Sequence, residues 1–161
     1  MTKDQKFRAV EEYVIQNKEK LYRIAYSYVK NKENALDIVQ ESIYKALRQV
    51  ESLKHVEYIK TWFYRIMVNT AIDFLRKNKR ISVVEDQVLD SHAEINEDDY
   101  ADLDLQHALD LLPPIYKTIV ILKYFEDLTL EEIAQVLGEN VNTVKTRLYS
   151  GLKKLRVEMQ K

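Results

Sequence analysis

The sequence predicts an all-α protein made of two small helical domains. The chain has 161 residues, of which 46% are hydrophobic, and this is enough to build two small cores. It contains only two glycines and two prolines, and the prolines are adjacent. Sheet proteins need many turns built from these residues, so their scarcity favours helices. Apolar residues also recur at three- and four-residue steps, which is the pattern of amphipathic helices.

The charge is segregated along the chain, although the net charge is only −1. Residues 1–80 carry a balance of +7 and residues 107–161 a balance of +1, whereas residues 81–106 contain nine acidic residues and no Lys or Arg. We therefore expect a first domain at 1–80, an acidic flexible linker at 81–104 and a second domain at 105–161. Two basic bodies around an acidic strip suggest polyanion binding, and ordinary solvated helix faces explain the charge pattern equally well.

Several classes of protein are excluded or disfavoured by composition. Cysteine is absent, which excludes disulfides, thiolate catalysis and cysteine metal sites. No apolar run approaches the roughly 20 residues that span a bilayer, so we expect a cytoplasmic protein. His55, His92 and His107 lack metal-ligand spacing, and there is no glycine-rich phosphate loop. We therefore expect a protein that has no enzymatic activity and that binds no metal, cofactor or small-molecule substrate.

Three helices are predicted in the first domain. The first runs from about Phe7 to Tyr28, and the second is expected to be capped by Asn34. A polar loop follows at 51–57, and the third helix covers about 58–77. Its buried stripe is predicted to consist of Ile59, Phe63, Ile66, Thr70 and Phe74.

A second stripe on the third helix has the composition of a nucleic-acid surface. Trp62, Arg65, Asn69, Asp73 and Arg76 follow one another at steps of three or four residues and so share a face. Aromatic rings stack on unpaired bases, cations bind the backbone, and an amide can bond to a base edge. From this helix alone, a core tryptophan with solvated arginines explains the pattern slightly better.

The segment 128–156 has the pattern of a helix-turn-helix. Thr129 and Glu132 form a capping box, Gly138 suits the left-handed end of a short helix, and Asn140 can cap the next one. In this motif the start of the second helix enters the major groove of DNA. That helix is expected to bury Val141, Val144, Leu148, Leu152 and Leu155.

The outward residues of the second helix are the expected DNA contacts. Lys145 can donate to guanine, and Asn142 can pair with adenine. The expected base-reading set is Asn142, Thr143, Lys145, Thr146, Tyr149 and Ser150, and the expected phosphate contacts are Arg147, Lys153, Lys154 and Arg156. The alternative is a plain helical hairpin with a solvated basic face.

The order and spacing of these motifs resemble a known family. The stretch Asp37-Ile38-Val39-Gln40-Glu41, the stretch 61–66 followed by Asn69, the stretch Leu112-Pro113-Pro114 and the helix-turn-helix together resemble extracytoplasmic-function sigma factors of the sigma-70 family. The similarity covers about residues 21–156, and it is greatest to short members from low-GC Gram-positive bacteria. The resemblance implies a protein that binds core RNA polymerase and directs it to promoters, without covalent chemistry.

The resemblance also implies roles for particular residues. Asp37, Gln40 and Glu41 would face the clamp of core polymerase. The loop residues Gln49 and Leu53, with Asn69, would hold a flipped base of the melted strand at the −10 element. The second domain would read duplex DNA at the −35 element and dock on the polymerase flap. A membrane-bound anti-sigma factor is the expected inhibitor, holding the protein at the inner face of the membrane until a stress response releases it.

Two other functions stay open at this point. An ordinary regulator would bind duplex DNA without polymerase, usually as a dimer on half-sites one helical turn apart. The aromatic and basic face of the third helix argues against it, because duplex binding needs no stacking surface. A helical adaptor would keep its activity after loss of the helix-turn-helix.

Overall fold

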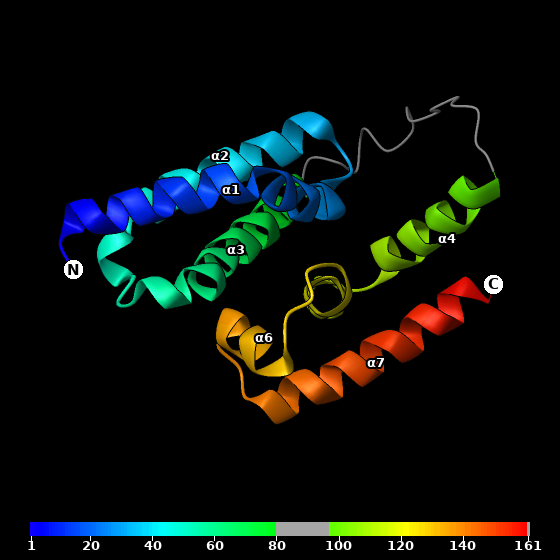
Figure 1. The fold of residues 1–161 in the computed structure, drawn as a ribbon. Helices are drawn as coiled ribbons and strands as arrows, with labels where there is room; N and C mark the ends of the chain where they lie inside the picture. The colour runs from blue at the N-terminus through cyan, green and yellow to red at the C-terminus, as the bar shows by residue number, and fades with distance from the viewer. Residues whose placement is uncertain (80–96, 161) are drawn as a thin grey trace. The chain divides into compact units, whose positions relative to one another are not determined.

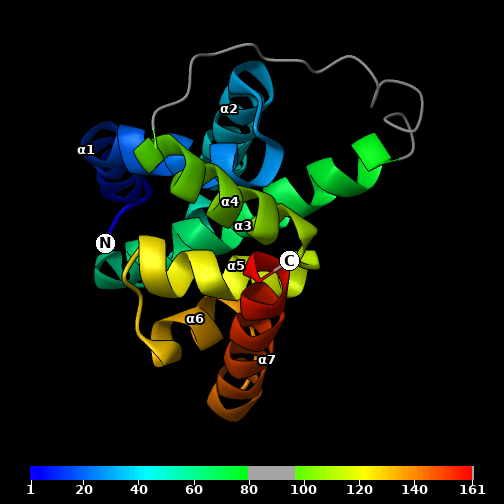
Figure 2. The ribbon, with the colours of Figure 1, turned by 90° about the vertical axis from the view of Figure 1, so that its right-hand side faces the viewer.

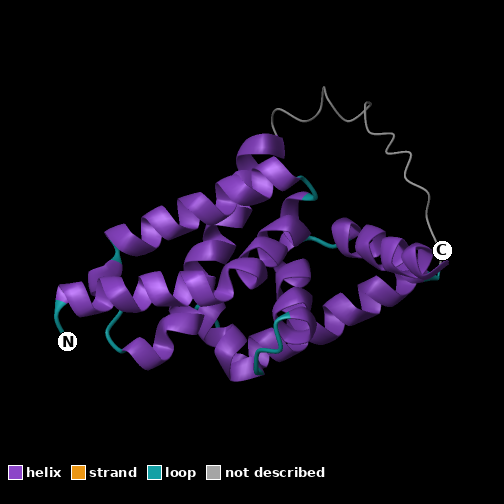
Figure 3. Ribbon diagram, turned by 45° about the horizontal axis from the view of Figure 1, so that its top comes forward, coloured by secondary structure: helices purple, strands orange, loops and turns teal. Residues whose placement is uncertain are grey.

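The computed structural model describes residues 1–79 and 97–160, and every regular element in these ranges is a helix (Figure 3). The predicted all-α class is therefore confirmed. The chain forms two compact units, one made of Met1–Arg76 with Ala134–Glu139 and the other of Lys77–Ile133 with Asn140–Lys161. Within the described ranges, no helix is both long and apolar enough to cross a membrane.

Helix α1 (Lys3–Val29) opens with a capping box that the sequence analysis did not identify. The Gln5 amide donates to Thr2 Oγ1 at 3.2 Å, and the Thr2 amide donates to Gln5 Oε1 at 2.9 Å. The helix kinks at Asn17, whose side-chain amide donates to the Tyr13 carbonyl at 2.8 Å and so competes with the backbone. It ends at Lys30 in a left-handed conformation. Among the apolar residues that predict this helix, Val10, Leu21, Ile24 and Tyr28 are buried, and Phe7 and Val14 are half-buried.

Helix α2 (Lys32–Arg48) begins one turn earlier than predicted, because its N-cap is Asn31 and not Asn34. Asn31 has an extended backbone, and its Oδ1 accepts from the Asn34 amide at 2.9 Å. Both asparagines suit an N-cap by residue type, but only Asn31 lies where the chain enters the helix. Helices α1 and α2 lie side by side (Figures 1 and 2).

A short loop with two 3₁₀ turns connects α2 to α3. The turns are η1 (Val50–Ser52) and η2 (Val56–Tyr58), and α3 covers Ile59–Lys79. The predicted stripe of α3 is fully buried at Phe63, Ile66 and Thr70, and only half-buried at its two ends. The third helix therefore contributes its centre to the core and leaves its opposite face exposed.

The second set of helices begins with α4 (Glu97–Leu111), which starts earlier than predicted. Residues 97–104 were expected to belong to the linker and are helical instead, while 80–96 lie outside the described residues. Next come α5 (Pro114–Val120), the π-helical turn η3 (Ile121–Phe125), α6 (Leu130–Leu137) and α7 (Val141–Met159). Helices α4 and α5 both pack against α7 (Figure 2). Lys117 Nζ, on the buried side of α5, lies 3.0 Å from Asp110 Oδ1 on α4.

Candidate nucleic-acid interfaces

The predicted nucleic-acid stripe of α3 faces outward. Arg65, Asn69, Asp73 and Arg76 are exposed, and Trp62 is half-buried. The first part of this stripe borders a hollow of about 430 Å³, which we call the α3 hollow. Its lining residues are Lys45, Gln49, Ser52, Trp62, Arg65, Ile66, Asn69 and Thr70.

The α3 hollow combines residues from two stretches of the chain, 45–52 and 62–70. Trp62, Arg65 and Asn69 come from α3, Lys45 comes from α2, and Gln49 is the residue that ends α2. These side chains supply an aromatic ring, two amides and two cations. Among the described residues that line the hollow, none is acidic. The lining suits an anionic, base-bearing ligand, because rings stack on bases while cations neutralise phosphates.

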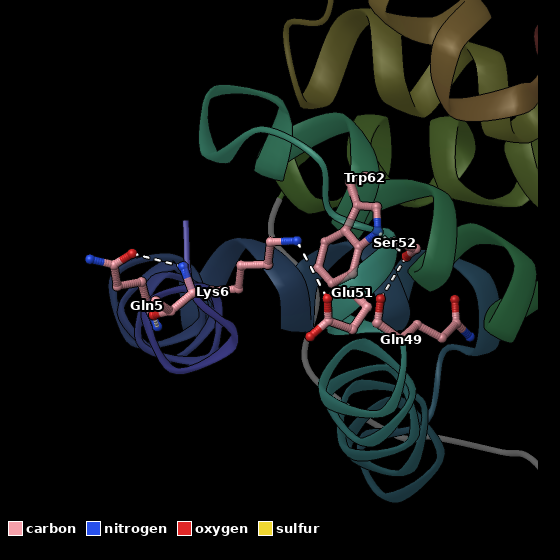
Figure 4. Close-up of polar contacts among 7 residues, drawn as sticks. Gln5, Lys6, Gln49, Glu51, Ser52 and Trp62 are labelled. Atoms are coloured by element: carbon pink, nitrogen blue, oxygen red, sulfur yellow. Dashed lines mark hydrogen bonds and ion pairs between the residues drawn. The ribbon is translucent and has the colours of Figure 1, made fainter.

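Hydrogen bonds fix the wall of the hollow between the loop and α3. Trp62 Nε1 donates to Ser52 Oγ at 2.9 Å, and Ser52 Oγ donates to the Gln49 carbonyl at 2.6 Å (Figure 4). Lys6 Nζ, near the start of α1, lies 3.7 Å from Glu51 Oε2 in the same loop (Figure 4). Trp62 is therefore neither a plain core residue nor a freely solvated one, since its ring is half-buried and its N–H is bonded.

Sequence reasoning did not find four of the lining residues, namely Lys45, Ser52, Ile66 and Thr70. Lys45 Nζ donates to Thr70 Oγ1 at 3.2 Å, and the Thr70 hydroxyl donates to the Ile66 carbonyl at 2.7 Å. A signal for Lys45 was present, because it lies one turn before Gln49. Ser52 carried no such signal, because its place depends on the path of the loop.

Leu53 does not take the predicted place in this site. Its side chain is 1% exposed and belongs to the core, as does that of Val50 in the same loop. A buried leucine holds the loop against the helices and offers no surface to a base. The prediction of a polar loop therefore holds only for its outward side chains.

The helix-turn-helix segment has the predicted local geometry. The Thr129 amide donates to Glu132 Oε1 at 3.0 Å, and the Glu132 amide donates to Thr129 Oγ1 at 3.1 Å, which completes the capping box. Gly138 has φ +66°, the left-handed conformation in which a side chain is strained. Asn140 Oδ1 accepts from the Asn142 amide at 2.7 Å and from the Thr143 amide at 3.3 Å, capping α7.

Helix α7 separates a buried face from an outward, basic one. Val144, Leu148 and Leu155 are buried as predicted and Leu152 is half-buried, but Val141 is wrong as a core residue because it is 36% exposed at the first position of the helix. Among the predicted DNA contacts, Thr143, Arg147 and Ser150 are half-buried. The exposed ones are Asn142, Lys145, Thr146, Tyr149, Lys153, Lys154 and Arg156.

Two side chains on this outward face already have local contacts. The Thr146 hydroxyl donates to the Asn142 carbonyl one turn earlier, at 3.0 Å. Lys154 Nζ lies 5.7 Å from the centre of the Tyr116 ring, a cation–π distance. Lys154 is therefore partly held by α5, whereas Tyr149, 61% exposed, extends into solvent.

Both halves of the chain match known sigma-factor regions. The model of sigma-70 region 2 matches residues 13–81, and that of sigma-70 region 4 matches residues 102–155. RNA polymerase sigma factor SigV of Bacillus subtilis is 57% identical over 148 residues, which cover 92% of this chain and 89% of that protein. The ECF RNA polymerase sigma factor SigW of the same organism is 32% identical and covers 89% of this chain and 84% of its own.

The chain belongs to the extracytoplasmic-function sigma factors of the sigma-70 family. Solved structures agree with the fold of this sigma factor. The sigma factor RpoE of Bartonella quintana, solved in complex with the anti-sigma factor NepR, has a TM-score of 0.74 at 21% identity and covers 93% of this chain and 96% of its own. CnrH, solved in complex with the cytosolic domain of CnrY, has a TM-score of 0.72 at 19% identity, and the match covers 98% of this chain and 94% of CnrH.

In this sigma factor, α2 carries a second exposed surface, on the region 2 side of the chain. Asp37, Gln40 and Glu41 are all exposed and recur at helical spacing, so they share a face. Two large apolar side chains are exposed on the same helix, Leu36 at 42% and Tyr44 at 57%. Acidic, amide and exposed apolar groups together suit contact with another protein, since exposed apolar clusters mark interaction surfaces.

Proposed function

We propose that this sigma factor binds core RNA polymerase and reads the −10 and −35 promoter elements with two separate surfaces. The observation that carries the proposal is the α3 hollow, where one aromatic ring, two amides and two cations converge on one open site. A protein that binds only duplex DNA has no use for a stacking site, whereas promoter opening requires one. The second surface is the outward face of α7, which follows a capped turn of helix-turn-helix type.

At the −10 element, the α3 hollow holds an unpaired base of the opened strand. Trp62 supplies the stacking ring, and Gln49 and Asn69 supply donors and acceptors for the base edge. Lys45 and Arg65 neutralise the flanking phosphates. Asp73 and Arg76 lie further along the same face of α3 and contact the opened strand beyond the hollow. Selective binding of opened DNA shifts the equilibrium towards the melted state without any covalent step.

At the −35 element, the first turns of α7 lie in the major groove of duplex DNA. Lys145 and Asn142 read base edges, and Thr143, Thr146, Tyr149 and Ser150 complete the base-facing set. Arg147 and Lys153 contact phosphates, which hold the helix in register without reading sequence.

We propose three functional segments that follow the charge pattern. Residues 1–80 form the region 2 domain, which contacts the polymerase clamp through Asp37, Gln40 and Glu41. Residues 105–161 form the region 4 domain, which docks on the flap, and the acidic stretch 81–104 connects the two. Core polymerase holds both DNA-reading surfaces on one promoter, which compensates for the small footprint of each surface alone.

We propose that the protein acts in the cytoplasm, has no enzymatic activity and is held inactive by an anti-sigma factor until a stress signal releases it. One structural neighbour was solved with an anti-sigma factor, which supports an inhibitor of this kind. Exposed apolar side chains such as Tyr44 and Tyr124 offer surface to such a partner. We expect the inhibitor to be membrane-bound. Recovery of a membrane protein with this chain from native cells would support it, and its repeated absence would count against it.

Run-off transcription with purified core polymerase tests the main proposal. Genomic fragments are transcribed with and without the sigma factor, and discrete start sites are expected only when it is present. Asn69→Ala and Lys145→Ala then test the −10 and −35 surfaces separately. If core polymerase ignores the protein while the protein alone still retains DNA fragments, it is an ordinary duplex-binding regulator and the proposal is wrong.

A further inference from the structure

Ser52 connects the Trp62 ring of α3, the proposed stacking surface of the −10 site, to the main chain of Gln49 at the end of α2. We infer that Ser52 is a positioning residue, whose hydroxyl holds the Trp62 ring in place against the main chain of Gln49 and thereby influences which unpaired base the α3 hollow accepts. The inference rests on the proposed function and names a residue of the same site that acts through its neighbours.

The direction of both hydrogen bonds of Ser52 follows from chemistry. An indole N–H can only donate, so Ser52 Oγ must accept from Trp62 Nε1, at 2.9 Å. The single hydroxyl proton is then available for the Gln49 carbonyl, at 2.6 Å. The Gln49 carbonyl also accepts from the Ser52 amide at 2.8 Å. The hydroxyl therefore has a partner for its proton and a donor for its oxygen, and it connects α3 to the residue that ends α2.

The loop that carries Ser52 is held from several directions. Val50 and Leu53, on either side of the hydroxyl-bearing residue, are each 1% exposed. Glu51 pairs with Lys6 on α1 at 3.7 Å, although Glu51 is well exposed and this pair contributes little by itself. The position of Ser52 Oγ is thus set by buried neighbours, and a short side chain transmits it to Trp62 with little freedom of its own.

Without this bond, the half-buried ring of Trp62 keeps only its packing contacts, such as the one with Phe63 at a centroid distance of 6.4 Å. The ring could then tilt relative to the main chain at Gln49, from which the proposed base-reading side chain extends, and the stacking plane would no longer be held at that position. Such a loss reduces the difference in affinity between one base and another more than it reduces the total affinity, because stacking accepts every base whereas hydrogen bonds to the base edge do not.

Trp62 is itself the probe, because the chain contains a single tryptophan. Proton–nitrogen correlation spectra of the full chain contain one indole resonance. Ser52→Ala should shift it and speed its exchange with water by roughly threefold to tenfold, as expected for loss of one hydrogen bond. Ser52→Thr keeps the hydroxyl and should restore the wild-type behaviour. Thr61→Ala is the matched control, since Thr61 precedes Trp62 but its hydroxyl donates to the Tyr58 carbonyl.

Base selectivity is measured on the same variants by quenching of Trp62 fluorescence with dT12, dC12 and dA12 at low salt. We expect Ser52→Ala to reduce the affinity ratio between the preferred and the other oligonucleotides by roughly threefold to tenfold, with Ser52→Thr and Thr61→Ala close to wild type. An unchanged indole resonance, or an unchanged ratio despite a changed resonance, would overturn the inference alone. Wild-type protein that binds none of the three oligonucleotides would contradict the −10 proposal, and the inference with it.

Discussion

Substitution of the N-cap of α7, compared with substitution of a proposed base-reading residue on the same turn, tests the stability of this helix and its binding to DNA separately. Asn140 Oδ1 accepts from the Asn142 and Thr143 amides at 2.7 and 3.3 Å. One oxygen serves both amides and the second bond is long, so the pair counts as about one good hydrogen bond. Asn140 is exposed, and water replaces part of what is lost. Asn140→Ala should therefore lower the free energy of unfolding by about 1 kcal/mol.

The matched control lies two residues away on the same turn. Asn142→Ala removes an exposed side chain that is proposed to read a base, and it leaves the cap intact because Asn142 contributes only its backbone amide. It should leave stability nearly unchanged and weaken binding to a −35 duplex by about 1–3 kcal/mol. Asn140→Asp keeps the acceptor and places a negative charge at the helix N-terminus, so it should retain stability. In the proposed −35 complex the added charge would repel DNA phosphates, so it should weaken binding.

Urea unfolding followed by circular dichroism, together with gel-shift titrations on one −35 duplex, measures both properties. The cap argument is refuted if Asn140→Ala leaves the unfolding midpoint at the wild-type value. The placement of α7 in the groove is refuted if Asn142→Ala and Asn140→Asp both bind the duplex like wild type.

Three further predictions concern the other interface residues. Trp62→Ala should weaken binding to opened promoter DNA by about 1–3 kcal/mol, whereas Trp62→Phe should keep part of that binding free energy. Permanganate footprinting of the −10 region measures both variants, and equal footprints would contradict stacking. Leu53→Ala should lower stability by about 2–5 kcal/mol, because it leaves a cavity in the core, while Leu53→Met should fold and transcribe almost normally. If the Leu53→Met variant is fully stable but chooses different start sites, Leu53 contacts DNA and its assignment to the core alone is wrong. Lys153→Ala should weaken binding to all duplex sequences equally and reduce the slope of log affinity against log salt concentration by about 1. Lys145→Ala should instead relax the sequence preference. An unchanged salt slope for Lys153→Ala would show that Lys153 does not contact a phosphate.

The sequence by itself determined the features whose partners are near neighbours in the chain. The capping box at Thr129 and the cap at Asn140 each join groups two or three residues apart, and the left-handed Gly138 depends on the backbone of a single residue, so residue type and spacing are sufficient to predict them. The outward stripe of α3 followed from helical period for the same reason. Where two residues suit one local role, as Asn31 and Asn34 do, the sequence did not distinguish them, and α4 began earlier than its apolar period indicated.

Only the tertiary structure decided which residues meet in the α3 hollow. Lys45 contacts Thr70 across 25 positions of the chain, and Ser52 contacts Trp62 across ten. Both contacts depend on how the loop at 49–58 crosses between α2 and α3. The same crossing directs Leu53 into the core and Ser52 towards the tryptophan. Short-range propensity does not encode that path, because it is set by the burial of Val50 and Leu53 against helices that are distant in the sequence.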